Sequence, residues 1–147
     1  MSSNIPERPA PSLPSAPVPA DRRSPGAGAF AELTTIGAGG GFRELVEASS
    51  EEEIVEAVRA ADAEGRPLMM LGGGSNVLAS DDYFDGVVVR DARQDVVLVQ
   101  EGGCEGANLR VTAGTPWDAF VVHTIEREWM GLEALSGIPG TVGAAPV

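Results

Sequence analysis

The sequence Leu71-Gly72-Gly73-Gly74-Ser75-Asn76-Val77-Leu78 joins the end of an apolar run, residues 67–71, to three glycines, a hydroxyl and an amide. Because glycine has no Cβ, its backbone can approach a bulky anion closely and can turn with positive φ at little steric cost. Consecutive N–H groups can then point into one concavity and bind phosphate oxygens. Ser75 and Asn76 add side-chain partners at the same place. The segment therefore predicts a phosphate-binding loop at the end of a strand.

Two better-known phosphate motifs do not fit this segment. A Walker A loop needs a lysine directly after its last glycine, and the next basic residue here is Arg90. A dinucleotide fingerprint needs a glycine at its sixth position, which is Val77 here, and a helix after it. Residues 80–86 instead predict a turn. Taken alone, the segment is also compatible with a tight glycine-rich connection that binds no ligand.

The neighbouring segments predict a mixed α+β order of short elements. Residues 43–48 predict a strand, and Ser50 with Glu53 forms a capping box that begins a helix ending at Gly65. Residues 67–71 predict a buried strand, which completes a β-α-β unit. The strands expected at 87–89, 96–99 and 108–113 indicate a meander, and a second helix is expected from Thr115 to about Met130, with Pro116 at its first position.

A second glycine-rich segment lies some sixty residues after the first. Its sequence is Gly131-Leu132-Glu133-Ala134-Leu135-Ser136-Gly137-Ile138-Pro139-Gly140-Thr141-Val142-Gly143-Ala144, in which Pro139 fixes φ. With the first loop and with Thr34-Thr35-Ile36-Gly37-Ala38-Gly39-Gly40, it resembles the UDP-N-acetylenolpyruvoylglucosamine reductases (UDP-N-acetylmuramate dehydrogenases). Their N-terminal half carries T-x-G-x-G-G, G-x-G-S-N and G-L-E-x-L-x-x-I-P-G-x-V-G-x-x-P in this order. The resemblance runs from about Leu33 to Val147.

The resemblance implies an α+β fold, the FAD-binding domain of the vanillyl-alcohol-oxidase (PCMH) type. Two small α+β subdomains of this domain sandwich the cofactor's diphosphate, with the first glycine loop in the first subdomain and residues 137–143 in the second. Residues 29–147 would form this domain, truncated in its second subdomain and incomplete at the C-terminus. The residues expected to bind FAD are Gly72, Gly73, Gly74, Ser75, Asn76, Gly137, Ile138, Gly140, Thr141 and Gly143.

The activity implied is reduction of UDP-N-acetylglucosamine-enolpyruvate, a small-molecule UDP-sugar, to UDP-N-acetylmuramate in peptidoglycan synthesis. FAD would accept a hydride from NADPH and pass it to the enolpyruvyl double bond. The catalytic residues are expected downstream of Val147, so we expect this chain alone to be an inactive fragment. Two alternatives stay open: the FAD-binding domain of another oxidase or dehydrogenase of the same fold, and a truncated FAD-binding module without catalysis.

The composition of the chain limits the binding partners and the cellular compartment that we expect for it. The formal net charge of −12 argues against nucleic acid, because phosphate backbones are bound with Lys and Arg. Residues 1–28 hold seven of the eleven prolines and predict a disordered tail with no secretory signal. No apolar run reaches the length of about 18 residues that spans a membrane. The single cysteine, Cys104, cannot form an internal disulfide, which suits the cytoplasm. The oligomeric state stays open.

Several single residues could catalyse a reaction or bind a metal, but their surroundings in the sequence favour structural roles. His123 stands alone among apolar neighbours, which favours a packing or surface role over catalysis. Cys104 has no nearby basic residue to activate its thiol. Trp117 and Trp129 are expected to anchor the core from one helix. Three aspartates lack the spacing of a metal-binding loop and fall where a turn is expected: Asp81, Asp82 and Asp85. No metal site is predicted.

Overall fold

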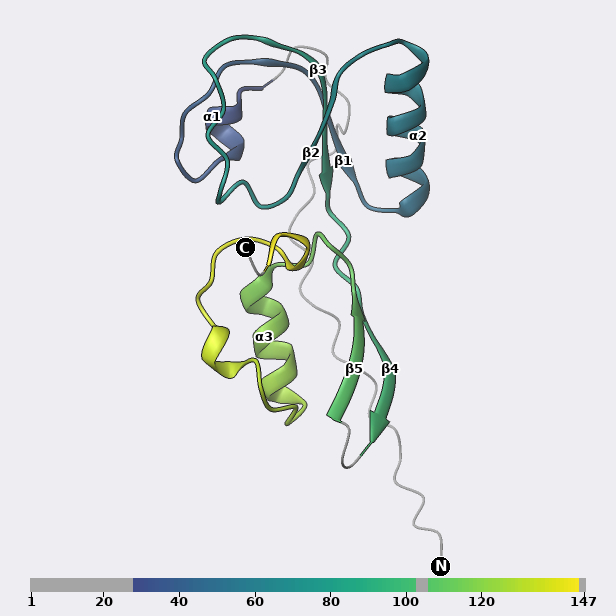
Figure 1. The fold of residues 1–147 in the computed structure, drawn as a ribbon, viewed down its shortest axis with the longest axis vertical. Helices are drawn as coiled ribbons and strands as arrows, with labels where there is room; N and C mark the ends of the chain where they lie inside the picture. The colour runs from purple at the N-terminus through teal and green to yellow at the C-terminus, as the bar shows by residue number, and fades with distance from the viewer. Residues whose placement is uncertain (1–27, 103–105, 146–147) are drawn as a thin grey trace, which may run out of the picture.

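A computed structural model describes residues 28–102 and 106–145, so the predictions for the proline-rich tail and for Cys104 lie outside the described residues. The described chain forms two lobes, one above the other in Figure 1. The first lobe contains α1 (Phe30–Leu33), β1 (Phe42–Ala48), α2 (Glu51–Ala63), β2 (Leu68–Leu71) and β3 (Phe84–Asp91). The second lobe contains β4 (Val96–Gly102), β5 (Gly106–Val111), α3 (Trp117–Glu126), η1 (Glu133–Leu135) and η2 (Val142–Ala144).

The first lobe is built on a parallel sheet with the strand order β1-β3-β2. Its central strand carries three consecutive valines, Val87 to Val89, each at most 2% exposed. Such an apolar run is typical of a parallel strand that is buried on both faces. The helix α2 covers one face of the sheet and α1 lies on the other side (Figure 1). Both faces are therefore closed by apolar packing.

The expected meander is wrong at its first strand. β3 does not pair with β4; it lies between β1 and β2 and runs parallel to both. The predicted β-α-β unit of β1, α2 and β2 does form, but β3 inserts between its two strands. Burial explains the difference, because a strand that is apolar at every position gains more from a central place in a covered sheet than from a half-exposed hairpin. The turn before β3 is also shorter than expected, because the strand begins at Phe84.

Local signals fix α2 almost as predicted. The Ser50 hydroxyl accepts a hydrogen bond from the Glu53 N–H at 3.1 Å. The return bond of the capping box is shifted by one residue, since the Glu53 carboxylate accepts from the Ser49 N–H at 2.7 Å. At the other end Gly65 has φ +63°, as expected of a glycine that ends a helix.

The second lobe is a β4–β5 hairpin with α3 packed on one face. Trp117, Phe120 and Val121 fill the space between helix and hairpin. The helix is shorter than predicted, because Pro116 is its N-cap rather than its first helical residue and Glu126 is its last. Glu128 then adopts φ +59°, which ends the helix without a glycine. Trp129 consequently lies beyond α3, not on it.

Candidate functional site

The first glycine loop, residues 72–76, leaves the carboxyl end of β2 in the parallel sheet. None of its five backbone N–H groups donates a hydrogen bond to another described residue. Ligands of open α/β sheets bind outside the carboxyl ends of the strands. A row of N–H groups without protein partners at this place can bind the oxygens of an anion. The N–H groups of the loop are thus available to a ligand, and phosphate binding there stays a prediction.

The second glycine loop, residues 137–143, divides its backbone N–H groups between two tasks. The Gly137 N–H donates to the Asp118 carboxylate at 2.8 Å, and the Gly143 N–H donates to the Ala113 carbonyl at 2.9 Å. The N–H groups of Ile138, Gly140 and Thr141 donate to no described residue. Of the five residues predicted in this loop, two therefore use their N–H groups to shape it, and three have N–H groups that a ligand can use.

The structure brings the two glycine loops into direct contact across the lobes. A Cβ added to Gly72 would lie 3.1 Å from Thr141 Oγ1, and one added to Gly73 would lie 3.1 Å from Gly140 Cα. The Ser75 hydroxyl donates to the Pro139 carbonyl at 3.4 Å. The predicted residues of both loops thus form one site. Because glycines stand at the points of closest approach, no side chain separates the two backbones there.

The third glycine of the first loop has a structural task. Gly74 is buried and has φ +71°, and a Cβ on it would lie 1.9 Å from the Leu33 carbonyl oxygen. Its own carbonyl accepts a hydrogen bond from the Thr35 N–H at 3.0 Å. The segment 34–40, matched in the sequence as T-x-G-x-G-G, therefore supports the first glycine loop at Gly74.

Asp118 is a site residue that the sequence did not single out for this purpose. Its carboxylate lies in the first turn of α3 and accepts from the Ser136 hydroxyl at 2.7 Å and from the Gly137 N–H at 2.8 Å. The hydrogen bond from Ser136, followed by that from Gly137, lowers the pKa of Asp118 below its ordinary value. The charged carboxylate thus holds the start of the second glycine loop on α3. In the sequence Asp118 is only an acidic residue near a helix N-terminus, where a negative charge is usually explained by its favourable interaction with the helix dipole.

The other candidate residues have structural partners. His123 is 7% exposed and meets the Trp129 ring edge-on, so the predicted packing role is confirmed. Trp117 belongs to the core of the second lobe as predicted, whereas the Trp129 indole donates to Glu101 at 2.9 Å on the surface. Among residues 28–102 and 106–145, no group of three or more His, Cys, Asp or Glu side chains is placed to hold a metal ion.

Comparison with known sequences defines the class of this site. The sequence profile of a family described as FAD binding domain matches residues 43–147, which include both glycine loops. The chain belongs to this family of FAD binding domains. FAD is accordingly the cofactor of this family. Its diphosphate is an anion of the kind that backbone N–H groups without protein partners can bind, and its binding at the two loops stays a prediction.

The particular relatives are UDP-N-acetylenolpyruvoylglucosamine reductases. The chain is 50% identical over 118 residues to the reductase of Cutibacterium acnes, which covers 80% of this chain and 31% of that protein. It is 45% identical over 129 residues to the reductase of Saccharopolyspora erythraea, covering 86% of this chain and 35% of that protein. The chain thus spans about a third of the length of these relatives.

A solved structure carries the same likeness. The crystal structure of UDP-N-acetylenolpyruvylglucosamine reductase from Thermus caldophilus matches with a TM-score of 0.59 and 29% identity, covering 80% of this chain and 39% of that one. The resemblance drawn from the three glycine motifs is therefore confirmed in both sequence and fold. The mixed helix and sheet arrangement agrees with the predicted α+β class of FAD-binding domain.

Proposed function

We propose that this chain is the FAD-binding part of a UDP-N-acetylenolpyruvoylglucosamine reductase. The supporting observation is the contact between the two glycine loops, which brings together segments from both lobes whose N–H groups have no partner among the described residues. The identity of 45–50% to reductases of this name supports the particular enzyme. The proposed reaction is the reduction, with NADPH, of UDP-N-acetylglucosamine-enolpyruvate to UDP-N-acetylmuramate.

In this proposal the chain's own residues bind and orient the cofactor. The N–H groups of residues 72–76 bind one side of the diphosphate, and those of Ile138, Gly140 and Thr141 bind the other. Neither loop contains Lys or Arg, so backbone dipoles supply the attraction in a chain whose formal net charge is −12. The hydroxyls of Ser75 and Thr141 lie at the same contact and add hydrogen-bonding partners. Bound FAD supplies the hydride chemistry, and the protein supplies its position.

The remaining assignments follow from the same proposal. Residues 29–147 form the FAD-binding unit, and the groups that bind the UDP-sugar and protonate the product belong to the remaining two thirds of the enzyme. Residues 1–28 stay a predicted disordered tail. We place the enzyme in the cytoplasm, where NADPH is available and a single cysteine stays reduced. Among the described residues, no helix is long and apolar enough to cross a membrane.

The activity is tested with the whole gene product that carries residues 1–147. Purified protein should contain flavin, oxidise NADPH when UDP-N-acetylglucosamine-enolpyruvate is added, and form a product two mass units heavier than the substrate. Flavin content with NADPH oxidation on a different sugar acid alone would favour another flavoenzyme of the same fold. Flavin content without turnover of any such substrate would favour a non-catalytic FAD-binding module. A protein that binds no FAD would contradict the proposal outright.

A further inference from the structure

The two lobes are joined by a very short connection between β3 and β4. The Ala92 N–H donates to the Ala48 carbonyl at 2.7 Å, so Ala92 still belongs to the first lobe. The Asp95 N–H donates to Thr112 Oγ1 at 2.8 Å, and the Asp95 carbonyl accepts from the Thr112 N–H at 3.0 Å, so Asp95 already belongs to the second lobe. Two residues, 93 and 94, lie between these anchors. The path of the chain between the lobes is therefore set by very few groups.

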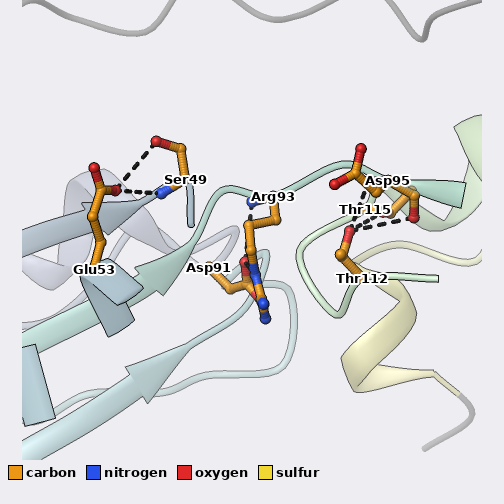
Figure 2. A network of polar contacts seen from close by, with 7 residues as sticks. All are labelled: Ser49, Glu53, Asp91, Arg93, Asp95, Thr112 and Thr115. Atoms are coloured by element: carbon orange, nitrogen blue, oxygen red, sulfur yellow. Dashed lines mark hydrogen bonds and ion pairs between the residues drawn. The ribbon is translucent and has the colours of Figure 1, made fainter. Parts of the chain in front are cut away.

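Asp91, the last residue of β3, is the polar centre of this connection (Figure 2). Its side chain is 10% exposed and accepts three hydrogen bonds from Arg93: from the backbone N–H at 3.0 Å, from Nε at 2.9 Å and from Nη2 at 2.7 Å. The backbone of Gly114, in the second lobe, also favours the charged form of this carboxylate and lowers its pKa. Burial alone would raise the pKa of Asp91, but the bonds from Arg93 and Gly114 lower it below its ordinary value. The carboxylate is therefore charged near neutral pH, and its three hydrogen bonds from Arg93 fix the shape of the connection between the lobes.

Gly114 is pressed against the same connection. A Cβ on Gly114 would lie 2.1 Å from the Asp91 carbonyl oxygen and 2.9 Å from the Arg93 carbonyl oxygen. Gly114 is not among the glycines with positive φ, so close packing rather than a special turn excludes a side chain here. The segment 113–117, which leads from β5 into the first residue of α3, is thus held directly on the end of β3.

The segment 113–117 also carries the second glycine loop. Three backbone hydrogen bonds join the two: Gly143 N–H to the Ala113 carbonyl at 2.9 Å, Val142 N–H to the Thr115 carbonyl at 2.8 Å, and Trp117 N–H to the Gly140 carbonyl at 3.0 Å. The segment 113–117 therefore packs on the Asp91–Arg93 connection through Gly114 and is hydrogen-bonded to the second loop. The first loop begins directly after β2, which pairs with β3 in the same sheet. Both loops are thus positioned relative to the end of β3.

We propose that Asp91 is a positioning residue for the cofactor: it holds the segment 113–117 on the end of β3 and so sets the separation of the two glycine loops. This inference rests on the proposed binding of FAD between those loops. Asp91 acts on the cofactor through the second loop, and Arg93 keeps its carboxylate in place. Loss of the carboxylate lets the second loop move relative to the first, and this weakens the binding of the diphosphate by the two loops together.

The test uses apoprotein of the whole gene product, titrated with FAD at a temperature where circular dichroism shows every variant folded. Asp91→Ala should weaken FAD binding about tenfold, the loss expected when one charge-assisted hydrogen bond no longer holds the loop. Asp91→Asn keeps one carbonyl acceptor but not the charge, so it should weaken binding by at least about threefold. In hydrogen exchange without FAD, the Val142 and Gly143 amides should exchange faster in both variants.

Two controls separate positioning from general stability. Val46→Ala removes core volume on the α2 side of the sheet, so it should lower stability and leave FAD affinity within about twofold of wild type. Asp85→Ala removes an exposed ion pair with Arg43 and should change neither the stability nor the FAD affinity. Affinity within twofold of wild type in both Asp91 variants, or in Asp91→Asn alone if Asp91→Ala does not fold, overturns the inference. Two other results would contradict the proposed function and not only the role of Asp91. One is a wild-type protein that binds no FAD; the other is normal FAD binding by Gly73→Val, which places a side chain at the contact between the loops.

Discussion

Gly73→Val is the substitution that tests the contact between the glycine loops most sharply. A Cβ at this position would lie 3.1 Å from Gly140 Cα and 3.5 Å from the Gly140 carbonyl carbon, both backbone atoms. Valine adds two further methyl groups that have to fit beside the diphosphate. Overpacking of this kind costs about 1–3 kcal/mol. If that cost falls on the FAD-bound state, it corresponds to about a 5- to 150-fold loss of affinity.

The assay compares the flavin-to-protein ratio after gel filtration with the dissociation constant from a fluorescence titration with FAD. Gly73 does not have positive φ, so backbone strain is small and we expect the apoprotein to fold with a wild-type circular dichroism spectrum. Ala60→Val, on the exposed side of α2, is the matched control and should retain FAD fully. Stoichiometric flavin with unchanged affinity in Gly73→Val would refute the placement of the diphosphate between the loops.

Three further predictions concern other parts of the site. Gly74→Ala should lower the free energy of unfolding by about 2–5 kcal/mol, because the residue has positive φ and its new Cβ clashes with the Leu33 carbonyl. Gly65→Ala, at positive φ in open space, should lower it by about 1–2 kcal/mol, and urea titrations of both variants measure the difference. Asp118→Ala should weaken FAD binding and speed exchange of the Gly137 amide, and Asp118→Asn, which keeps a carbonyl acceptor, should do so less; equal behaviour of Asp118→Ala and wild type would argue against this role. Burial, followed by the positive charge of Arg127, lowers the pKa of His123, so the stability it contributes is present above pH 6.5 and is lost as the pH falls through its folded pKa. Thermal melts of wild type should therefore drop more steeply below pH 6.5 than those of His123→Gln, and parallel curves would contradict this.

Signals that act within a few residues predicted much of the first lobe. Ser50 and Gly65 mark the two ends of α2 because a cap and a left-handed glycine satisfy groups in the same turn. The strands at 43–48 and 67–71 were expected from their apolar pattern, and the structure confirms both to within a residue. In each case the determining contacts are local or depend only on burial.

Features that depend on partners far along the chain were missed. The place of β3 between β1 and β2 is set by pairing with two distant strands, so its three valines indicated burial but not its neighbours. The end of α3 was predicted too late in the sequence. Glu128 adopts positive φ, and the glycine or asparagine that usually marks such a position is absent there.

The residues of the candidate site were named from the sequence, and their binding of FAD stays a prediction; the residues that support the two loops were not named. Both glycine loops were found from their motifs, and their meeting followed from the resemblance to the reductases. Asp91 and Asp118 act on residues 19 or more positions away, Asp91 through Gly114 and Asp118 through Gly137. An aspartate at the end of a strand or the start of a helix has a local explanation, so nothing in the sequence separated these two from other acidic residues.

The central claim is that FAD binds with its diphosphate between the first and second glycine loops. The most direct measurement is a crystal structure of the whole gene product with FAD bound. We predict diphosphate oxygens within about 3 Å of backbone nitrogens from both loops, including at least one of Ile138, Gly140 and Thr141. A diphosphate that contacts one loop alone, or lies elsewhere on the molecule, would contradict the claim.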